Sequence, residues 1–214
     1  MDEKKAVLLN SGGLDSFLAG KWLDANGYII HSLYIHWTVG GTVYNPLVEQ
    51  AALETSDRIH AVSHTIFPLA GDSLFGEYNK LPHRPCCSST MYYAIAGAYA
   101  YNKGCRYVAS GHMYFDKVNH YEEDYFQAIN TLFKAHYYGK NDKAVQAGLA
   151  KREDITTGRH FELLLPVFRL QDTAGFMASL GIGHDELKHT YSCALYPPCQ
   201  KCHKCIRRGQ LGLE

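Results

Sequence analysis

The sequence predicts an α/β protein with a doubly wound, mostly parallel sheet of five strands. Short apolar and β-branched runs alternate along the chain with segments of helical spacing, as they do where parallel strands are buried between two layers of helices. The first run, AVLLN (6–10), enters a turn with two glycines, NSGGLDS (10–16), before the first helix. Ligands of such sheets bind beyond the carboxyl ends of the strands, so this turn is the first candidate for a binding loop.

Each later element has a signal of its own. The run at 28–37 is β-branched and aromatic, the helix over 45–59 has Pro46 near its start, and the helix over 88–104 begins with serine caps. The region 116–160 predicts irregular helices and loops. The expected strands are 6–10, 28–37, 60–67, 106–111 and 161–168, and the expected helices are 16–26, 45–59, 88–104 and one that runs through FMASL to Gly181.

The composition predicts a soluble, cytoplasmic protein with one main core. Of the 214 residues, 46% are hydrophobic and 20% are charged, and 21 basic residues balance 21 acidic ones. The chain therefore has no net positive charge that would favour a nucleic acid as a partner. The start, MDEKK, does not resemble a signal peptide, and no run of 18 uncharged apolar residues predicts a membrane span.

The turn after the first strand has the residues that a phosphate site needs. Gly12 and Gly13 let backbone N–H groups approach an anion, the hydroxyls of Ser11 and Ser16 can donate, and the next helix presents its positive end. A Walker A loop requires a lysine that is missing here, so the γ-phosphate is not the obvious target. The alternative is a tight turn in which Asp15 and Ser16 only cap the helix.

Four cysteines near the C-terminus form the second strong signal. Cys193, Cys199, Cys202 and Cys205 are separated by five, two and two residues, and four thiolates with this spacing favour a closed, tetrahedral structural Zn²⁺ site. His203 lies between two of these ligands and is expected to be exposed. An iron-sulfur cluster is the open alternative. An odd total of seven cysteines fits a reducing compartment better than a set of disulfides.

The glycine-rich turn resembles the SGGxDS signature of the PP-loop ATP pyrophosphatases, which have a HUP-like fold and cleave ATP between its α- and β-phosphates. The resemblance implies a nucleotide-binding domain over 1–185, a zinc-binding segment over 186–214, and Mg²⁺ bound with the ATP. His112, just after the fourth strand, should face the same crevice as the loop, although a structural histidine is an equal alternative. The implied nucleotide-binding residues are Ser11, Gly12, Gly13, Leu14, Asp15, Ser16, Tyr34, His36, Gly111 and His112.

The two signals together resemble 7-cyano-7-deazaguanine synthase, the QueC family of queuosine biosynthesis. The likeness extends to TYSC (190–193), AIAGAYAY (94–101) and Arg208. It implies a C–N ligase, often a homodimer, that adenylates 7-carboxy-7-deazaguanine. Ammonia then displaces AMP to give an amide, and a second ATP converts the amide to a nitrile.

Three segments depart from the family's pattern. HRPCCSST (83–90) keeps only Arg84 and a capping serine, and SGHMYFDKVNHYEED (110–124) keeps only Asp116. RLQDTAG (169–175) has Asp172 where the family has a lysine, and Arg169 is the nearest substitute in sequence. The candidate catalytic residues are Ser11, Asp15, Ser16, Arg84 and Asp116.

These departures leave two further functions open. One is a diverted ligase that joins the deazaguanine acyl group to another amine, such as a protein N-terminus, as the resemblance to QueC-like proteins of bacterial antiphage operons suggests. The other is a nucleotide-binding or zinc-stabilised module without catalytic activity.

Overall fold

A parallel sheet lies at the centre of the computed structural model, which describes residues 4–39, 42–43, 46–70, 88–113, 123–133, 161–191, 193 and 198–213. The parallel strands are β1 (Lys5–Leu9), β2 (Ile29–Val39), β4 (Ser63–Ala70), β5 (Tyr107–Ser110) and β6 (Glu162–Leu164). They lie in the order β4-β2-β1-β5-β6, and the short strand β3 (Thr42–Val43) pairs antiparallel with the end of β2. The predicted five-stranded parallel sheet is confirmed.

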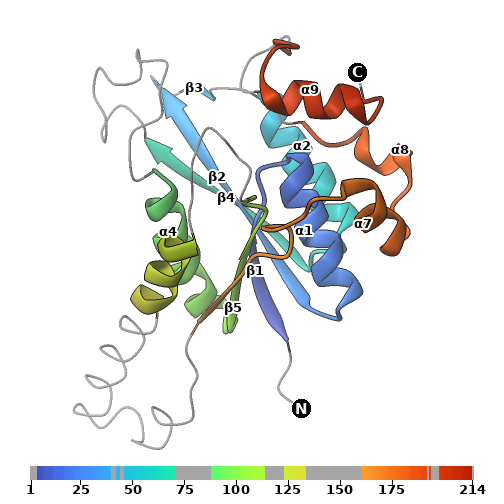
Figure 1. Cartoon of the computed structure of the whole chain (residues 1–214). Helices are drawn as coiled ribbons and strands as arrows, with labels where there is room; N and C mark the ends of the chain where they lie inside the picture. Colours follow the sequence, from blue (N-terminus) through green and yellow to red (C-terminus); the bar gives the residue numbers. More distant parts are fainter. Residues whose placement is uncertain are drawn as a thin grey trace, which may run out of the picture.

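Helices cover both faces of this sheet (Figure 1). One side carries α1 (Leu14–Ala25), α2 (Pro46–Arg58), α7 (Thr173–Ser179), α8 (His184–Leu187) and α9 (His203–Gln210), and the other side carries α4 (Ser88–Lys103) and the helix of residues 123–133. The chain runs outward from β1 through β2 to β4 and then crosses back to β5 on the far side of β1. The order of strands therefore reverses between β1 and β5, where ligands of this fold bind.

The sheet has an apolar core on each face, and the side chains of β1 alternate between these two cores. Ala6 and Leu8 pack with Phe17 of α1, whereas Val7 points to the opposite face and packs with Tyr93 of α4. All five side chains are fully buried. An apolar run without polar alternation is what a strand covered on both faces requires.

The C-terminal part of the chain joins the first of these cores. Ile182, Leu187 and Leu213 are buried in the same apolar cluster as Ala6 and Leu8. The segment after β6 therefore packs on the α1 side of the sheet. Within the described ranges, every helix is too short or too polar to span a lipid bilayer.

Several elements differ in extent from the sequence prediction. The expected strand over 161–168 is shorter, because Pro166 cannot donate to a ladder and the N–H of Phe168 turns back to the Leu165 carbonyl at 3.2 Å. Within the region predicted as irregular, residues 123–133 form one regular helix. The short helices α8 and α9 are not among the helices that the sequence predicts.

We expect Leu8→Ala to lower the free energy of unfolding by about 2–5 kcal/mol, because it removes a fully buried side chain from β1. Leu53→Ala is the matched control, since 49% of Leu53 is exposed on α2, and it should change stability by less than about 0.5 kcal/mol. Urea denaturation of both variants measures the difference. Equal losses would contradict the assigned core.

Candidate functional site

The side chain of Asn10, directly after β1, braces the glycine-rich loop. It is buried, with 1% of its surface exposed. Its Nδ2 lies 2.9 Å from the Ala52 carbonyl, 3.1 Å from Thr55 Oγ1 and 3.2 Å from Ser32 Oγ, while its Oδ1 accepts from the Gly12 N–H at 3.0 Å. One amide thus ties the end of β1 to β2, to α2 and to the loop. Buried networks of this kind fix a single geometry.

Gly12 has the backbone conformation and the space that only glycine tolerates. Its φ is +70°, and a Cβ there would lie 2.6 Å from the Ala52 nitrogen and 2.8 Å from the Val48 carbonyl oxygen. The Gly12 carbonyl accepts from the Tyr191 N–H at 2.8 Å. The loop is therefore held between α2 and the C-terminal segment. Gly13 has an extended backbone, with φ −81°, that any residue adopts.

The hydroxyls of the loop lie beside the positive end of α1. Ser11 Oγ and Ser16 Oγ are 3.2 Å apart, and Ser16 Oγ donates to the Gly13 carbonyl at 2.9 Å. Because α1 begins at Leu14 and its N-cap is Gly13, no N-cap side chain covers the helix end. Asp15 and Ser16 lie within the first helical turn. Hydroxyls beside a helix N-terminus form an arrangement that can bind an anion.

The end of β5 packs directly against this loop. A Cβ on Gly111 would lie 2.4 Å from the carbonyl carbon of Asp15 and 2.4 Å from the nitrogen of Ser16. Only a residue without a side chain allows the two backbones to approach so closely. The sequence-predicted residues Asp15, Ser16 and Gly111 are thus brought together at the switch point of the sheet.

A polar cluster lies next to Gly111. The Tyr93 hydroxyl is 2.7 Å from Ser110 Oγ and 2.7 Å from His112 Nδ1, and Ser110 Oγ is 3.0 Å from the same nitrogen. Tyr93 is fully buried and Ser110 is 2% exposed. These contacts fix the orientation of the His112 ring at the carboxyl end of β5.

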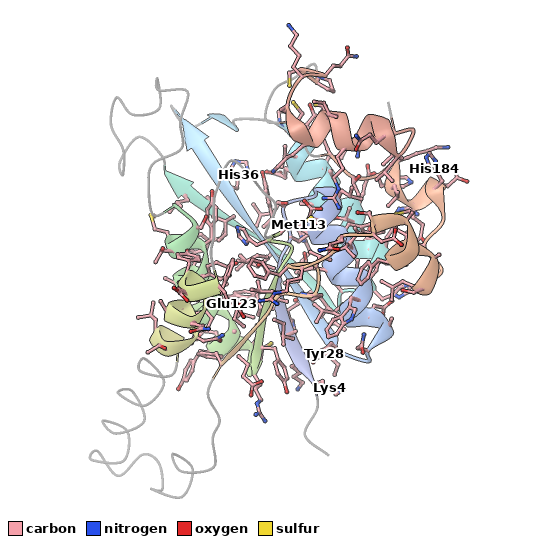
Figure 2. The ribbon with its side chains drawn as sticks, viewed as in Figure 1. Lys4, Tyr28, His36, Met113, Glu123 and His184 are labelled. Atoms are coloured by element: carbon pink, nitrogen blue, oxygen red, sulfur yellow. The ribbon has the colours of Figure 1, made fainter. Side chains whose placement is uncertain are left out.

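Tyr34 and His36 lie toward the carboxyl end of β2. Both side chains are buried, and their rings meet edge to face with centroids 5.8 Å apart. His36 Nδ1 lies 2.6 Å from Glu49 Oε2. Figure 2 labels both His36, which lies on β2, and Met113, which lies near the middle of the view. The part of Tyr34 and His36 in binding a nucleotide stays a prediction.

Arg207 of α9 reaches the loop from the other end of the chain. Its Nη1 forms an ion pair with the Asp15 carboxylate and lies 2.8 Å from Met113 Sδ, and its Nη2 donates to Thr173 Oγ1 at 2.9 Å. The neighbouring Arg208 donates to the Thr190 carbonyl at 2.6 Å. Two consecutive arginines therefore attach α9 to the loop and to the segment that precedes the cysteines.

The four predicted cysteine ligands converge on one point. The sulfur atoms of Cys193, Cys199, Cys202 and Cys205 all lie within 4.8 Å of one another, and two of the pairs are 3.9 Å and 3.5 Å apart. Ligands about 2.3 Å from a tetrahedral ion are about 3.8 Å from each other. The cluster can therefore hold one metal ion. The ligands of a four-iron cluster bind four different irons, which places their sulfur atoms farther apart.

The protein environment shifts the pKa values of two of these thiols in opposite directions. N–H groups of Lys201 and Cys202 lower the pKa of the Cys199 thiol, whereas burial raises the pKa of the Cys205 thiol.

The described structure does not bring every predicted site residue to the loop. Arg84 and Asp116 are outside the described residues. The exposed side chain of Arg169 pairs with Glu123. Asp172 caps α7 by accepting from the Gly175 N–H at 2.8 Å.

The sequence reasoning missed Asn10, Tyr93 and Arg207. Asn10 is part of the NSGGLDS stretch, and its position directly after a buried strand is a signal that could have found it. No local pattern marks Tyr93 or Arg207, because their partners are 19 and 192 residues away in sequence.

The sequence matches the family described as "Queuosine biosynthesis protein QueC" over residues 5–213. The chain belongs to the QueC family. A search of curated proteins found no significant match.

Several solved structures have folds similar to this one. A 4-thiouridine synthetase in complex with RNA and ATP has 19% identity and a TM-score of 0.52, over 98% of this chain and 50% of that one. The U34-tRNA thiolase NcsA from Methanococcus maripaludis, with its 4Fe-4S cluster, has 16% identity and a TM-score of 0.50, over 99% and 65%. NMN synthetase from Francisella tularensis has 14% identity and a TM-score of 0.50, over 90% and 68%. This QueC-family chain shares their fold.

We expect Gly12→Ala to destabilise the protein more than Gly27→Ala. Both glycines have positive φ, +70° and +72°, so both substitutions carry a left-handed backbone penalty of about 1–2 kcal/mol. Only at Gly12 would the new methyl group meet the backbone of α2, whereas at Gly27 nothing lies within 4 Å. Thermal unfolding of the two variants separates the backbone penalty from the steric clash with α2. Equal melting temperatures would contradict the close contact between the loop and α2.

We expect Cys202→Ser to abolish the binding of one metal ion per chain, because it removes one of four converging thiolates. Cys105→Ser is the control. Cys105 is buried away from the cluster, and burial raises the pKa of its thiol to about 11. Elemental analysis of the purified variants gives the stoichiometry; a wild-type chain without bound metal would contradict the assignment.

Proposed function

We propose that this protein uses ATP to activate a carboxylate as an acyl-adenylate and then joins the acyl group to an amine. The observation that carries the proposal is the loop braced by Asn10 at the switch point of the sheet. There the hydroxyls of Ser11 and Ser16 and the N-terminus of α1 converge beside the end of β5. Such a preorganised set suits the charge that develops on a departing pyrophosphate. Membership of an ATP-using family supports the same reaction class.

The first step forms a mixed anhydride. A carboxylate oxygen attacks the α-phosphorus of ATP, the bond between that phosphorus and the bridging oxygen breaks, and pyrophosphate leaves. The amine then attacks the carbonyl carbon, the bond to the AMP oxygen breaks, and the amine gives up a proton. His112 is the candidate to accept this proton, because Tyr93 and Ser110 hold its ring at the end of β5.

The QueC family suggests 7-carboxy-7-deazaguanine as the acid and ammonia as the amine. The amide oxygen would then attack the α-phosphorus of a second ATP with release of pyrophosphate, and loss of AMP and of the two remaining protons on nitrogen would leave the nitrile. Diverted chemistry would replace ammonia with a larger amine. The two routes share the loop and the first step.

The metals have different roles in this proposal. Four thiolates within reach of one ion fit structural Zn²⁺, which would hold the C-terminal segment in its fold. Mg²⁺ would arrive with ATP, bound mainly by phosphate oxygens. Iron in place of zinc in the purified protein would contradict the zinc assignment.

We expect the wild-type protein to convert ATP, Mg²⁺, 7-carboxy-7-deazaguanine and ammonia to AMP and pyrophosphate. Asp15→Ala should lower kcat/KM on the order of a hundredfold, the effect seen when one electrostatic group is removed from an active site. Asp24→Ala, at the other end of the same helix, should leave the rate unchanged, because Asp24 pairs with the exposed His60.

Mass spectrometry of the products identifies the acceptor. A nitrile supports the ordinary QueC reaction, whereas an accumulated amide, or an acyl group on a co-purifying protein, supports the diverted ligase. Formation of ADP, or no turnover with any acid, would contradict acyl-adenylate chemistry.

A further inference from the structure

We propose that Arg207 binds the phosphates of ATP at the glycine-rich loop, and that the four-cysteine cluster holds it there. This inference rests on the proposed function, since it assigns a phosphate-binding cation to the same site. It concerns α9, which begins 193 residues after the first residue of the loop at position 10.

The contacts of Arg207 leave part of its guanidinium available. Nη1 is used by Asp15 and Met113, and Nη2 donates once, to Thr173. Among the described residues, no partner is recorded for Nε or for the second N–H of Nη2. These two atoms form one edge of the guanidinium, and such an edge matches two oxygens of one phosphate.

The exposure of the ion pair suits a ligand site better than a structural role. The side chain of Arg207 is 24% exposed and that of Asp15 is 30% exposed. An ion pair at such a surface contributes about 0–1 kcal/mol to folding. The same guanidinium beside the N-terminus of α1 adds a full positive charge to the partial charge of the helix end. Phosphate oxygens placed there would contact both.

Arg207 also lies where the sequence leads one to expect a missing cation. Its Nη2 contacts Thr173, the first residue of α7, next to Asp172. Asp172 stands in the segment where the resemblance implies a lysine, and it serves instead as the cap of α7. Arg169 is turned away in its pair with Glu123. The cation at this helix start therefore comes from α9.

The cysteine cluster fixes the start of α9. Cys202 is the N-cap residue of this helix and its sulfur accepts from the Cys205 N–H at 3.5 Å, so two of the four sulfur ligands bracket the first turn. Arg207 is two residues further on. A helix of eight residues is marginal by itself. Metal binding supplies the free energy that the short helix lacks.

A second connection runs from α9 back to the loop. Arg208 donates to the Thr190 carbonyl, and the next residue, Tyr191, donates to the Gly12 carbonyl at 2.8 Å. Both the cluster and this link must be in place for the Arg207 guanidinium to meet Asp15. Arg207 is thus a binding residue, and the cysteines are positioning residues that act through it.

The test is the affinity of the metal-loaded, full-length protein for ATP and Mg²⁺, measured by calorimetry. Arg207→Ala should weaken binding about 10- to 100-fold, the range for loss of charged hydrogen bonds, and Arg207→Lys should recover only part of it because a lysine lacks the planar fork. Arg106→Ala is the matched control, since Arg106 pairs with Glu162 at the amino end of β5. It should bind ATP as the wild type does.

The role of the cluster is tested by removing the metal with a chelator. ATP affinity of the wild type should fall by a factor similar to that of Arg207→Ala, and the metal-free Arg207→Ala variant should show little further loss. Amide hydrogen exchange should increase in α9 while β1 stays protected. Arg207→Ala itself should keep its metal.

Three results would overturn the inference. Wild-type affinity in Arg207→Ala, with ATP cleavage intact in the wild type, overturns it and leaves the proposed function standing. Unchanged ATP affinity after metal removal, or global loss of protection, overturns the role of the cluster. A wild-type protein that binds no ATP overturns the proposed function together with this inference.

Discussion

The buried amide of Asn10, directly after β1, contacts β2, helix α2 and the backbone of the glycine-rich loop, and its partners on β2 and α2 are 22 to 45 residues away in sequence. Two of the groups that it contacts have further partners, since Ser32 Oγ also lies 2.9 Å from His64 Nδ1 and Thr55 Oγ1 donates to the Ala51 carbonyl at 2.7 Å. A buried group that loses its hydrogen bond costs about 1–3 kcal/mol. The conformation of the loop, the close approach of Gly12 to α2 and the direction of α1 all depend on this one residue.

The loop is closed from two further sides. Gly111 at the end of β5 touches the first turn of α1 from the sheet, and Tyr191 and Arg207 reach it from the C-terminal segment. The sheet contacts the loop through the backbone at Gly111, whereas the C-terminal segment brings the charged side chain of Arg207 to it. The cysteine cluster can therefore affect the loop without touching it, because α9 connects the two.

Much of this arrangement could be predicted from the sequence. Apolar runs indicate where the strands occur along the chain, and the spacing of Gly12, Asp15 and the four cysteines marks both the loop and the metal cluster. These signals can be read from short segments, because they depend on residues that are close to one another in the sequence. The role of Arg207 depends on how α9 docks, and that is a product of tertiary packing. Tyr93 is similar: within an apolar helix it reads as core, and only the position of Ser110 and His112 gives its hydroxyl a function in the site.

The central claim, that a carboxylate is adenylated at the loop after β1, is tested most directly with a carboxylate labelled with ¹⁸O on both oxygens. The metal-loaded, full-length protein is incubated with labelled 7-carboxy-7-deazaguanine, ATP, Mg²⁺ and ammonia, and the nucleotide product is analysed by mass spectrometry. If a carboxylate oxygen attacks the α-phosphorus, this oxygen stays on the phosphate when the amine displaces the nucleotide, and AMP should carry one ¹⁸O from the acid. Unlabelled AMP, or label in inorganic phosphate with release of ADP, would contradict the account.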